Sequence, residues 1–151
     1  MNRYLKLFIF CAVTLTLVNA GSIQAQERMR TRMFLNRTNL IIRDAKETVA
    51  VGKVYTGDLV KAVHHQRFAR TLFREGKFER AVLHSMRARE LSFAAIKANK
   101  HEIRKDWELK REEKALIKNR PENSELDGEV KIPEGADDKS VLNEKEEDLK
   151  D

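Results

Sequence analysis

Apolar and small residues recur along this chain at alternating steps of three and four, the spacing of one helix face. The first stripe predicts a helix from about Arg28 to Val51. Its members are Leu35, Thr38, Ile42, Ala45 and Val49. No segment shows the sustained alternation or the β-branched runs bounded by turns that indicate strands. The pattern therefore predicts an all-α fold.

A second helix is predicted after the turn that Gly52 and Gly57 indicate. Asp58 is the predicted N-terminal cap of this helix. Gly76 should end it, because glycine adopts a left-handed conformation at little steric cost. The apolar stripe between them consists of Leu59, Ala62, Gln66, Ala69 and Phe73.

The third predicted helix is long, because no glycine or proline occurs from Lys77 to Arg120. A stripe of small residues lines its first half: Ala81, Ser85, Ala88, Ser92 and Ala95. A second stripe continues the same spacing: Phe93, Ile96, Lys100, Ile103, Trp107, Lys110, Lys114 and Ile117. At 1.5 Å per residue, one helix over this range spans about 60 Å. The small residues should pack closely against another helix, and the more polar second half should project into solvent.

The turn at Gly76 lies within the sequence ARTLFREGKFERAVLHSMRARE, which resembles one tetratricopeptide unit over about residues 65–93. Two positions depart from that family: Ser85 stands where a larger residue is common, and Phe93 where a proline would end the helix. The chain has no second copy, whereas stacked repeats come in threes or more. The resemblance implies an antiparallel hairpin and a helical surface for protein binding. The expected hairpin packing residues are Phe68, Ala69, Leu72, Gly76, Phe78, Ala81, Val82, Ser85, Ala88, Ser92 and Ala95.

Residues 1–25 have the three parts of a secretory signal peptide: a basic start, a short apolar run and a small-residue exit. The apolar run is shorter than the roughly 20 residues that span a bilayer. Cleavage fits after Ala20 or Ala25, and the alternating pair formed by Ile23 and Ala25 favours the second. We therefore expect a periplasmic or secreted protein with no membrane span once the signal is removed.

Charge divides the remaining chain into two parts. Residues 26–120 contain 24 basic and 12 acidic residues, net +12. Residues 121–151 contain 4 basic and 12 acidic residues, net −8, with both prolines and no aromatic residue. Such a segment has little apolar surface to bury. The sequence predicts a basic helical domain followed by a disordered acidic tail, which could mask the basic domain.

Residues suited to catalysis or metal binding are scattered. Cys11, the only cysteine, lies inside the predicted signal, so the mature chain has no thiol, disulfide or cysteine metal site. The histidines, His64, His65, His84 and His101, do not form the spaced pairs of a zinc site. Phosphate-binding loops and nucleophile elbows are also absent from the sequence. We expect no enzyme activity, no metal and no cofactor.

Arginines are the strongest candidates for contact with a partner, since their guanidinium groups bind carboxylate and phosphate in pairs of hydrogen bonds. Those in the predicted hairpin are Arg67, Arg70, Arg74, Arg80, Arg87 and Arg89. Export argues against nucleic acid as a ligand, and we expect none. An acidic protein surface or an anionic envelope polymer fits better, and a solvated helix face neutralised by the tail is the simplest interpretation. Asn36 begins an Asn-x-Thr glycosylation sequence, but it lies in the middle of a predicted helix, so we do not predict glycosylation there.

These observations predict a small all-α bundle of about three helices, with a long extended third helix and a disordered acidic tail. The expected function is an exported, non-enzymatic protein-interaction module or adaptor of the cell envelope. The alternatives are a basic binder of anionic envelope polymer and a small helical periplasmic chaperone. The partner's identity, the oligomeric state and the biological process do not follow from the sequence.

Overall fold

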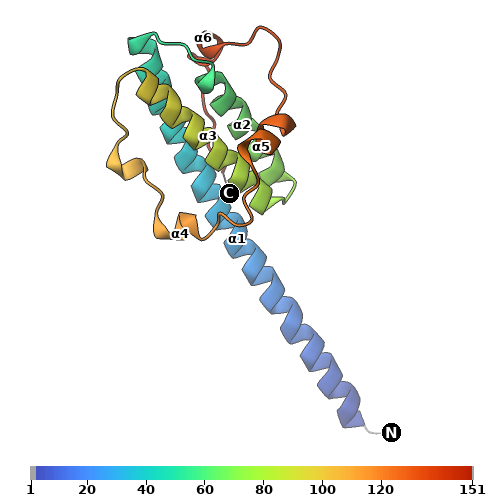
Figure 1. The fold of residues 1–151 in the computed structure, drawn as a ribbon. Coiled ribbons are helices and arrows are strands. Elements are labelled where there is room, and N and C mark those ends of the chain that lie inside the picture. The colour runs from blue at the N-terminus through green and yellow to red at the C-terminus, as the bar shows by residue number, and fades with distance from the viewer. Residues whose placement is uncertain (1–2, 151) are drawn as a thin grey trace.

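The computed structural model describes residues 3–150, with side chains from residue 22 onward. Every regular element in this part of the chain is a helix (Figure 1). Three long helices, α1, α2 and α3, come first in the chain. A 3-10 turn and three short helices, α4, α5 and α6, then lie against them. The all-α expectation is confirmed, whereas the expectation of about three helices covers only the long ones.

Helix α1 (Arg3–Gly52) packs against α2 and α3 with its C-terminal half. Its N-terminal half extends away from the other helices (Figure 1). The predicted stripe is fully buried in the C-terminal half: Leu35, Thr38, Ile42, Ala45 and Val49. The helix expected over residues 28–51 is therefore present, as part of a longer one.

Helices α2 (Asp58–Arg74) and α3 (Phe78–Ala98) form an antiparallel hairpin that packs on α1. Gly76 joins them in the left-handed region at φ +77°, as its position predicts. The amide of Lys77 donates to the carbonyl of Leu72 at 2.9 Å, a closure typical of helix ends. The small stripe of α3 is buried against the other two helices: Ala81, Ser85, Ala88, Ser92 and Ala95.

Helix α3 ends at Ala98, so the expected single helix from Lys77 to Arg120 is wrong. Asn99 is the reason. Its side-chain amide donates to the carbonyls of Ala95 at 2.9 Å and Val54 at 3.0 Å, and its oxygen accepts from the Val54 amide at 3.0 Å. These bonds tie the end of α3 to the loop after α1. Lys100 then adopts a left-handed φ of 60°, which reverses the chain.

Residues 101–120 return along α1 and α3 as a strap and do not project into solvent (Figure 1). The strap contains the 3-10 turn Lys105–Trp107 and helix α4 (Arg111–Lys114). The indole Nε1 of Trp107 donates to Asp44 of α1 at 2.8 Å. Apolar side chains of the strap pack on the end of the core near Phe34: Leu109, Leu116 and Ile117. The apolar residues whose spacing predicted a long helix therefore lie in a segment that folds back and packs on the core.

The acidic tail is also placed against the bundle, so the expectation that it is disordered is wrong in this structure. It contains α5 (Asn123–Glu129) and α6 (Asp138–Val141), which contact α3 and α2 respectively. Its buried side chains are Leu126, Asp138, Val141 and Glu146. The tail has few apolar residues of its own, but the folded bundle offers basic partners to its carboxylates.

Asp138 completes the N-terminus of α2 from the tail. Its two carboxylate oxygens accept hydrogen bonds from the amides of Gly57 at 2.8 Å and Val60 at 2.9 Å. Asp58, the cap expected from the sequence, instead accepts from the Thr56 hydroxyl at 2.8 Å. The orphan amides at this helix end are thus satisfied by a residue far away in the sequence.

Candidate functional site

Residues 144–149 have no regular secondary structure and lie between polar side chains of α1 and α2, at a position that we call the groove. Asn36 of α1 forms two hydrogen bonds to the backbone of Leu149: its amide donates to the carbonyl at 3.0 Å, and its oxygen accepts from the amide at 2.8 Å. Asn39 donates to the carbonyl of Glu147 at 2.9 Å. These contacts recognise a main chain, so they do not depend on the side chains of the bound segment.

Two cations extend the same row of α1. Arg43 donates to the carbonyl of Glu146 at 3.2 Å, and Lys46 donates to the carbonyl of Glu144 at 2.8 Å. The segment therefore runs antiparallel to the helix. Steps of three and four separate the row's members, which places them on one helix face: Asn36, Asn39, Arg43 and Lys46.

Glu146 is the side chain of the segment that enters the groove most deeply, with its side chain 1% exposed. One carboxylate oxygen lies 2.6 Å from the Lys46 Nζ, and the other lies 3.6 Å from an Arg70 nitrogen. Arg70 also donates to the carbonyl of Glu147 at 3.0 Å. A carboxylate without water around it requires such partners, so this pocket selects for an acidic side chain.

The remaining ion pairs of the groove lie at its rim. Arg67 of α2 binds the carboxylate of Glu144, and Arg43 lies 3.1 Å from a carboxylate oxygen of Asp148. All four side chains keep more than a third of their surface exposed. Exposed pairs of this kind contribute about 0–1 kcal/mol each. The buried Glu146 contacts and the backbone bonds therefore define the groove.

A second polar site joins the hairpin to α5. His65 and His84 are buried, with their Nδ1 atoms 3.1 Å apart. The Nε2 of His65 lies 3.1 Å from a carboxylate oxygen of Asp127, and the Nε2 of His84 lies 3.3 Å from one of Glu129. Phe68 contacts the His84 ring edge-on, with ring centroids 4.7 Å apart. Two carboxylates of the tail thus cover two histidines of the bundle.

The protons of this site are set by burial. The site has three close contacts: one between the two rings, one from His65 to Asp127 and one from His84 to Glu129. Each contact needs one N–H donor to be a hydrogen bond, but two neutral histidines supply only two. A third proton would complete the set but would place a charge away from water. Burial lowers the pKa of each histidine to about 4, despite the raising effect of Asp127. The pair is therefore neutral near pH 7.

Arginines of α3 fix the carboxylates that face the histidines. Arg87 donates two hydrogen bonds of 2.7 Å to Asp127, and these bonds hold the pKa of that carboxyl below its usual range. Arg80 binds the carboxylate of Glu129 and lies 3.3 Å from one of Glu125. Charge-assisted hydrogen bonds thus attach helix α5 to α3, beside the fully buried Leu126.

Arg89 attaches the strap from within the core. Its side chain is 1% exposed and lies over the Phe34 ring, with the guanidinium carbon 4.0 Å from the ring centroid. It donates to the Thr38 hydroxyl at 2.7 Å and to Glu113 at 2.8 Å. Arg37 binds the other oxygen of Glu113. Burial raises the pKa of the Glu113 carboxyl, but its hydrogen bonds from Arg89 and the Lys110 amide leave it lower than usual.

The structure separates the predicted contact arginines into three groups. Four bind carboxylates of the tail: Arg67, Arg70, Arg80 and Arg87. Arg89 binds the strap, and Arg74 is exposed at the end of α2.

The predicted packing residues of the hairpin are mostly buried. Buried are Ala69, Leu72, Phe78, Ala81, Val82, Ser85, Ala88, Ser92 and Ala95. Phe68 is half-buried, and Gly76 is exposed in the turn.

Of the residues that hold residues 144–149, the sequence identified Arg67 and Arg70 as contact candidates, but not Asn36, Asn39 or Lys46. Asn36 and Asn39 were a usable signal, because asparagine has low helix propensity and rarely repeats on a helix face without a polar partner. Lys46 was one of many basic residues. Glu146 had no distinguishing feature within an acidic run, so its burial could not be foreseen. The histidine pair was also missed, because its members come from two helices.

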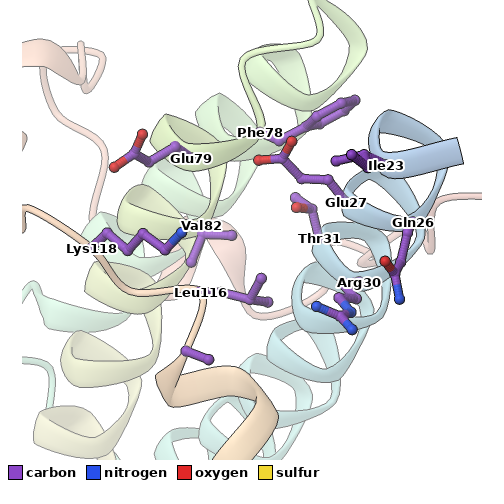
Figure 2. A pocket seen from close by; sticks show the side chains of 11 residues that line it. Ile23, Gln26, Glu27, Arg30, Thr31, Phe78, Glu79, Val82, Leu116 and Lys118 are labelled. Atoms are coloured by element: carbon purple, nitrogen blue, oxygen red, sulfur yellow. The ribbon is translucent and has the colours of Figure 1, made fainter. Parts of the chain in front are cut away.

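A cavity of about 290 Å³ lies where α1 leaves the bundle (Figure 2). Ile23, Val82 and Leu116 form its apolar side, and Glu27, Arg30, Glu79 and Lys118 place charges around it. Figure 2 shows that these side chains come from α1, the start of α3 and the strap. In the part of the chain with described side chains, no three acidic, histidine or cysteine residues are arranged to hold a metal ion.

The chain matches no protein-family model, no curated protein and no solved structure. The likeness of residues 65–93 to a tetratricopeptide unit therefore gains no family assignment. None of the described helices combines the length and apolar composition that crossing a membrane requires.

Proposed function

We propose that this protein is an exported, non-enzymatic helical interaction module, or adaptor, of the cell envelope. The supporting observation is the groove between α1 and α2, in which Asn36 binds the backbone of Leu149 as donor and acceptor. A surface that holds a segment through its main chain suits a protein that works by contact with another polypeptide.

The proposed location follows from the N-terminal sequence. Residues 1–25 have the basic start, apolar run and small-residue exit of a secretory signal. Cleavage after Ala25 would leave a chain without cysteine, which suits an oxidising compartment. The interaction module would then act in the periplasm or outside the cell.

The non-enzymatic proposal rests on the roles of the most reactive side chains. His65 and His84 are enclosed between α2, α3 and α5, and their ring nitrogens face each other and two carboxylates. The buried carboxylate of Glu113 is engaged by Arg89 and Arg37. These groups connect segments of the fold, which is a structural role.

A protein ligand fits the basic residues better than an anionic polymer does. Four arginines of the hairpin already bind tail carboxylates: Arg67, Arg70, Arg80 and Arg87. A polymer would have to displace the whole tail to reach them. An extended protein segment that displaced only residues 144–149 would reach Arg67 and Arg70 and leave α5 on Arg80 and Arg87.

Capture from envelope extract on the immobilised full-length chain tests the proposal, at low salt and at about 1 M salt, where screening removes surface ion pairs. We expect one protein to be retained in stoichiometric amount at both concentrations. Retention of a salt-sensitive anionic polymer would favour the alternative function. Retention of nothing would count against an envelope interaction module.

A further inference from the structure

Residues 144–149 match the row of side chains on α1 in length as well as in chemistry. From Asn36 to Lys46 the helix rises about 15 Å, at 1.5 Å per residue. The bound segment covers that distance in five steps, from Glu144 to Leu149, which is about 3 Å per residue. An extended chain advances at about this rate, roughly 3.3 Å per residue. The polar row therefore binds four of the six carbonyls along an extended segment, those of Glu144, Glu146, Glu147 and Leu149.

The groove also distinguishes side chains at two positions. Glu146 occupies the enclosed site between Lys46 and Arg70, where an uncharged or basic side chain would leave two cations facing each other. Leu149 packs against the part of the core that includes Phe34 and Leu72. The bound segment therefore contains the pattern Glu-x-x-Leu.

We infer that this groove is a binding site for an extended acidic segment of a partner protein, with the pattern Glu-x-x-Leu. Residues 144–149 are its resident competitor. This inference rests on the proposed function, since it names the class of partner that the interaction module recognises. Three hydrogen bonds to Asn36 and Asn39 are made by main-chain atoms of the segment, so a segment of another protein can form the same bonds. Asn39 donates one more, to the Asp148 carboxylate at 2.8 Å.

Tethering gives the resident segment an advantage over any free peptide. A ligand on a short flexible linker has an effective concentration in the millimolar range. Residues 142–144 form a short connection from the end of α6 to the groove, so the segment is always close to it. A partner segment therefore binds when its own affinity exceeds this competition or when the resident segment is weakened.

The test uses a fluorescent synthetic peptide with the sequence of residues 143–151 and the full-length chain. A tail-weakened variant, Glu146→Gln with Leu149→Ala, loses the buried carboxylate and the apolar contact of the resident segment, while the ion pairs at the rim remain. We expect it to bind the peptide at least about tenfold more tightly than the unmodified chain does. Fluorescence anisotropy measures the binding, and circular dichroism confirms that the variant is folded.

Further substitutions in the tail-weakened variant identify the site. Asn36→Ala should reduce peptide affinity without changing charge. Lys46→Ala should reduce it, whereas Lys61→Ala, which removes the same charge from an exposed position of α2, should not. A peptide with lysine in place of the glutamate at position 146 should bind at least tenfold more weakly.

Three results would overturn the inference. One is a folded tail-weakened variant that does not bind the peptide. Another is equal loss of binding with Lys46→Ala and Lys61→Ala, which would indicate attraction by charge alone. The third is an unmodified chain that is dimeric in light scattering and binds peptide better on dilution, because the occupant would then be the tail of a second copy. If the peptide binds but no envelope protein is captured, the groove is still a peptide-binding site, and only the proposed function is rejected.

Discussion

The imidazole rings of His65 and His84 face each other across the hairpin, with their Nδ1 atoms 3.1 Å apart. Each ring directs its Nε2 atom to a carboxylate of α5. This arrangement connects the protonation of the bundle to the attachment of the tail. Because burial lowers the pKa of both histidines to about 4, it also predicts how stability responds to acid.

The free energy of unfolding should decrease as the pH falls from about 6.5 to about 4. The folded histidines have pKa values below the unfolded value of about 6.5, so the unfolded chain binds more protons over this range. The stabilisation is complete above pH 6.5, and its loss amounts to at most about 3.5 kcal/mol per histidine. Urea unfolding at several pH values measures the effect.

A histidine substitution provides the control for this pH dependence. His84→Asn removes one titrating group, so the pH slope between about 4 and 6.5 should become shallower. A slope that His84→Asn does not alter would exclude the pair as the source.

Ala88→Leu should destabilise the fold by about 1–3 kcal/mol, because Ala88 is fully buried where α3 packs on the other long helices. Thermal and urea unfolding measure the change. Ala94→Leu is the matched control on the same helix, since Ala94 is exposed and the larger side chain meets solvent. Equal effects of the two substitutions would contradict the close packing of the small stripe.

Glu113→Ala should destabilise the protein by about 3–5 kcal/mol, because it leaves the buried guanidinium of Arg89 without its carboxylate partner. The strap should also detach, which hydrogen exchange of residues 101–120 would detect. Glu112→Ala removes a neighbouring carboxylate at an exposed position and should have little effect. Similar stabilities of the two variants would show that the buried pair does not hold the strap.

Asp138→Ala should cost about 1–2 kcal/mol, because the amides of Gly57 and Val60 lose their acceptors at the N-terminus of α2. Amide exchange at the start of α2 should quicken, and α6 should loosen with it. Glu134→Ala, at an exposed position of the tail, is the control. Unchanged exchange at Gly57 and Val60 in the Asp138 variant would disprove the cap.

The attachment of the tail shows where local sequence reasoning fails. Residues 121–151 contain few apolar side chains, so considered alone they lack the surface that would order them. Leu126 and Val141 become buried only because the bundle provides a surface for them. Glu146 becomes buried because Lys46 and Arg70 meet at one place on two helices. These partners lie far away in the sequence, and no periodicity brings them together.

The sequence alone determined the elements whose causes are local. Alternating steps of three and four placed the buried faces of α1, α2 and α3, because side-chain direction in a helix follows residue number. Gly76 ended α2, because glycine takes the left-handed conformation at little cost.

Tertiary structure decided where the third helix stops, where the tail lies and which polar groups meet. Asn99 could continue a helix as well as end one, and its bonds to Val54 settled the outcome. Asn36 and Leu149, like His65 and His84, came together only when the helices packed. The physical reason is that a polar side chain has many possible partners, and only the folded chain selects one.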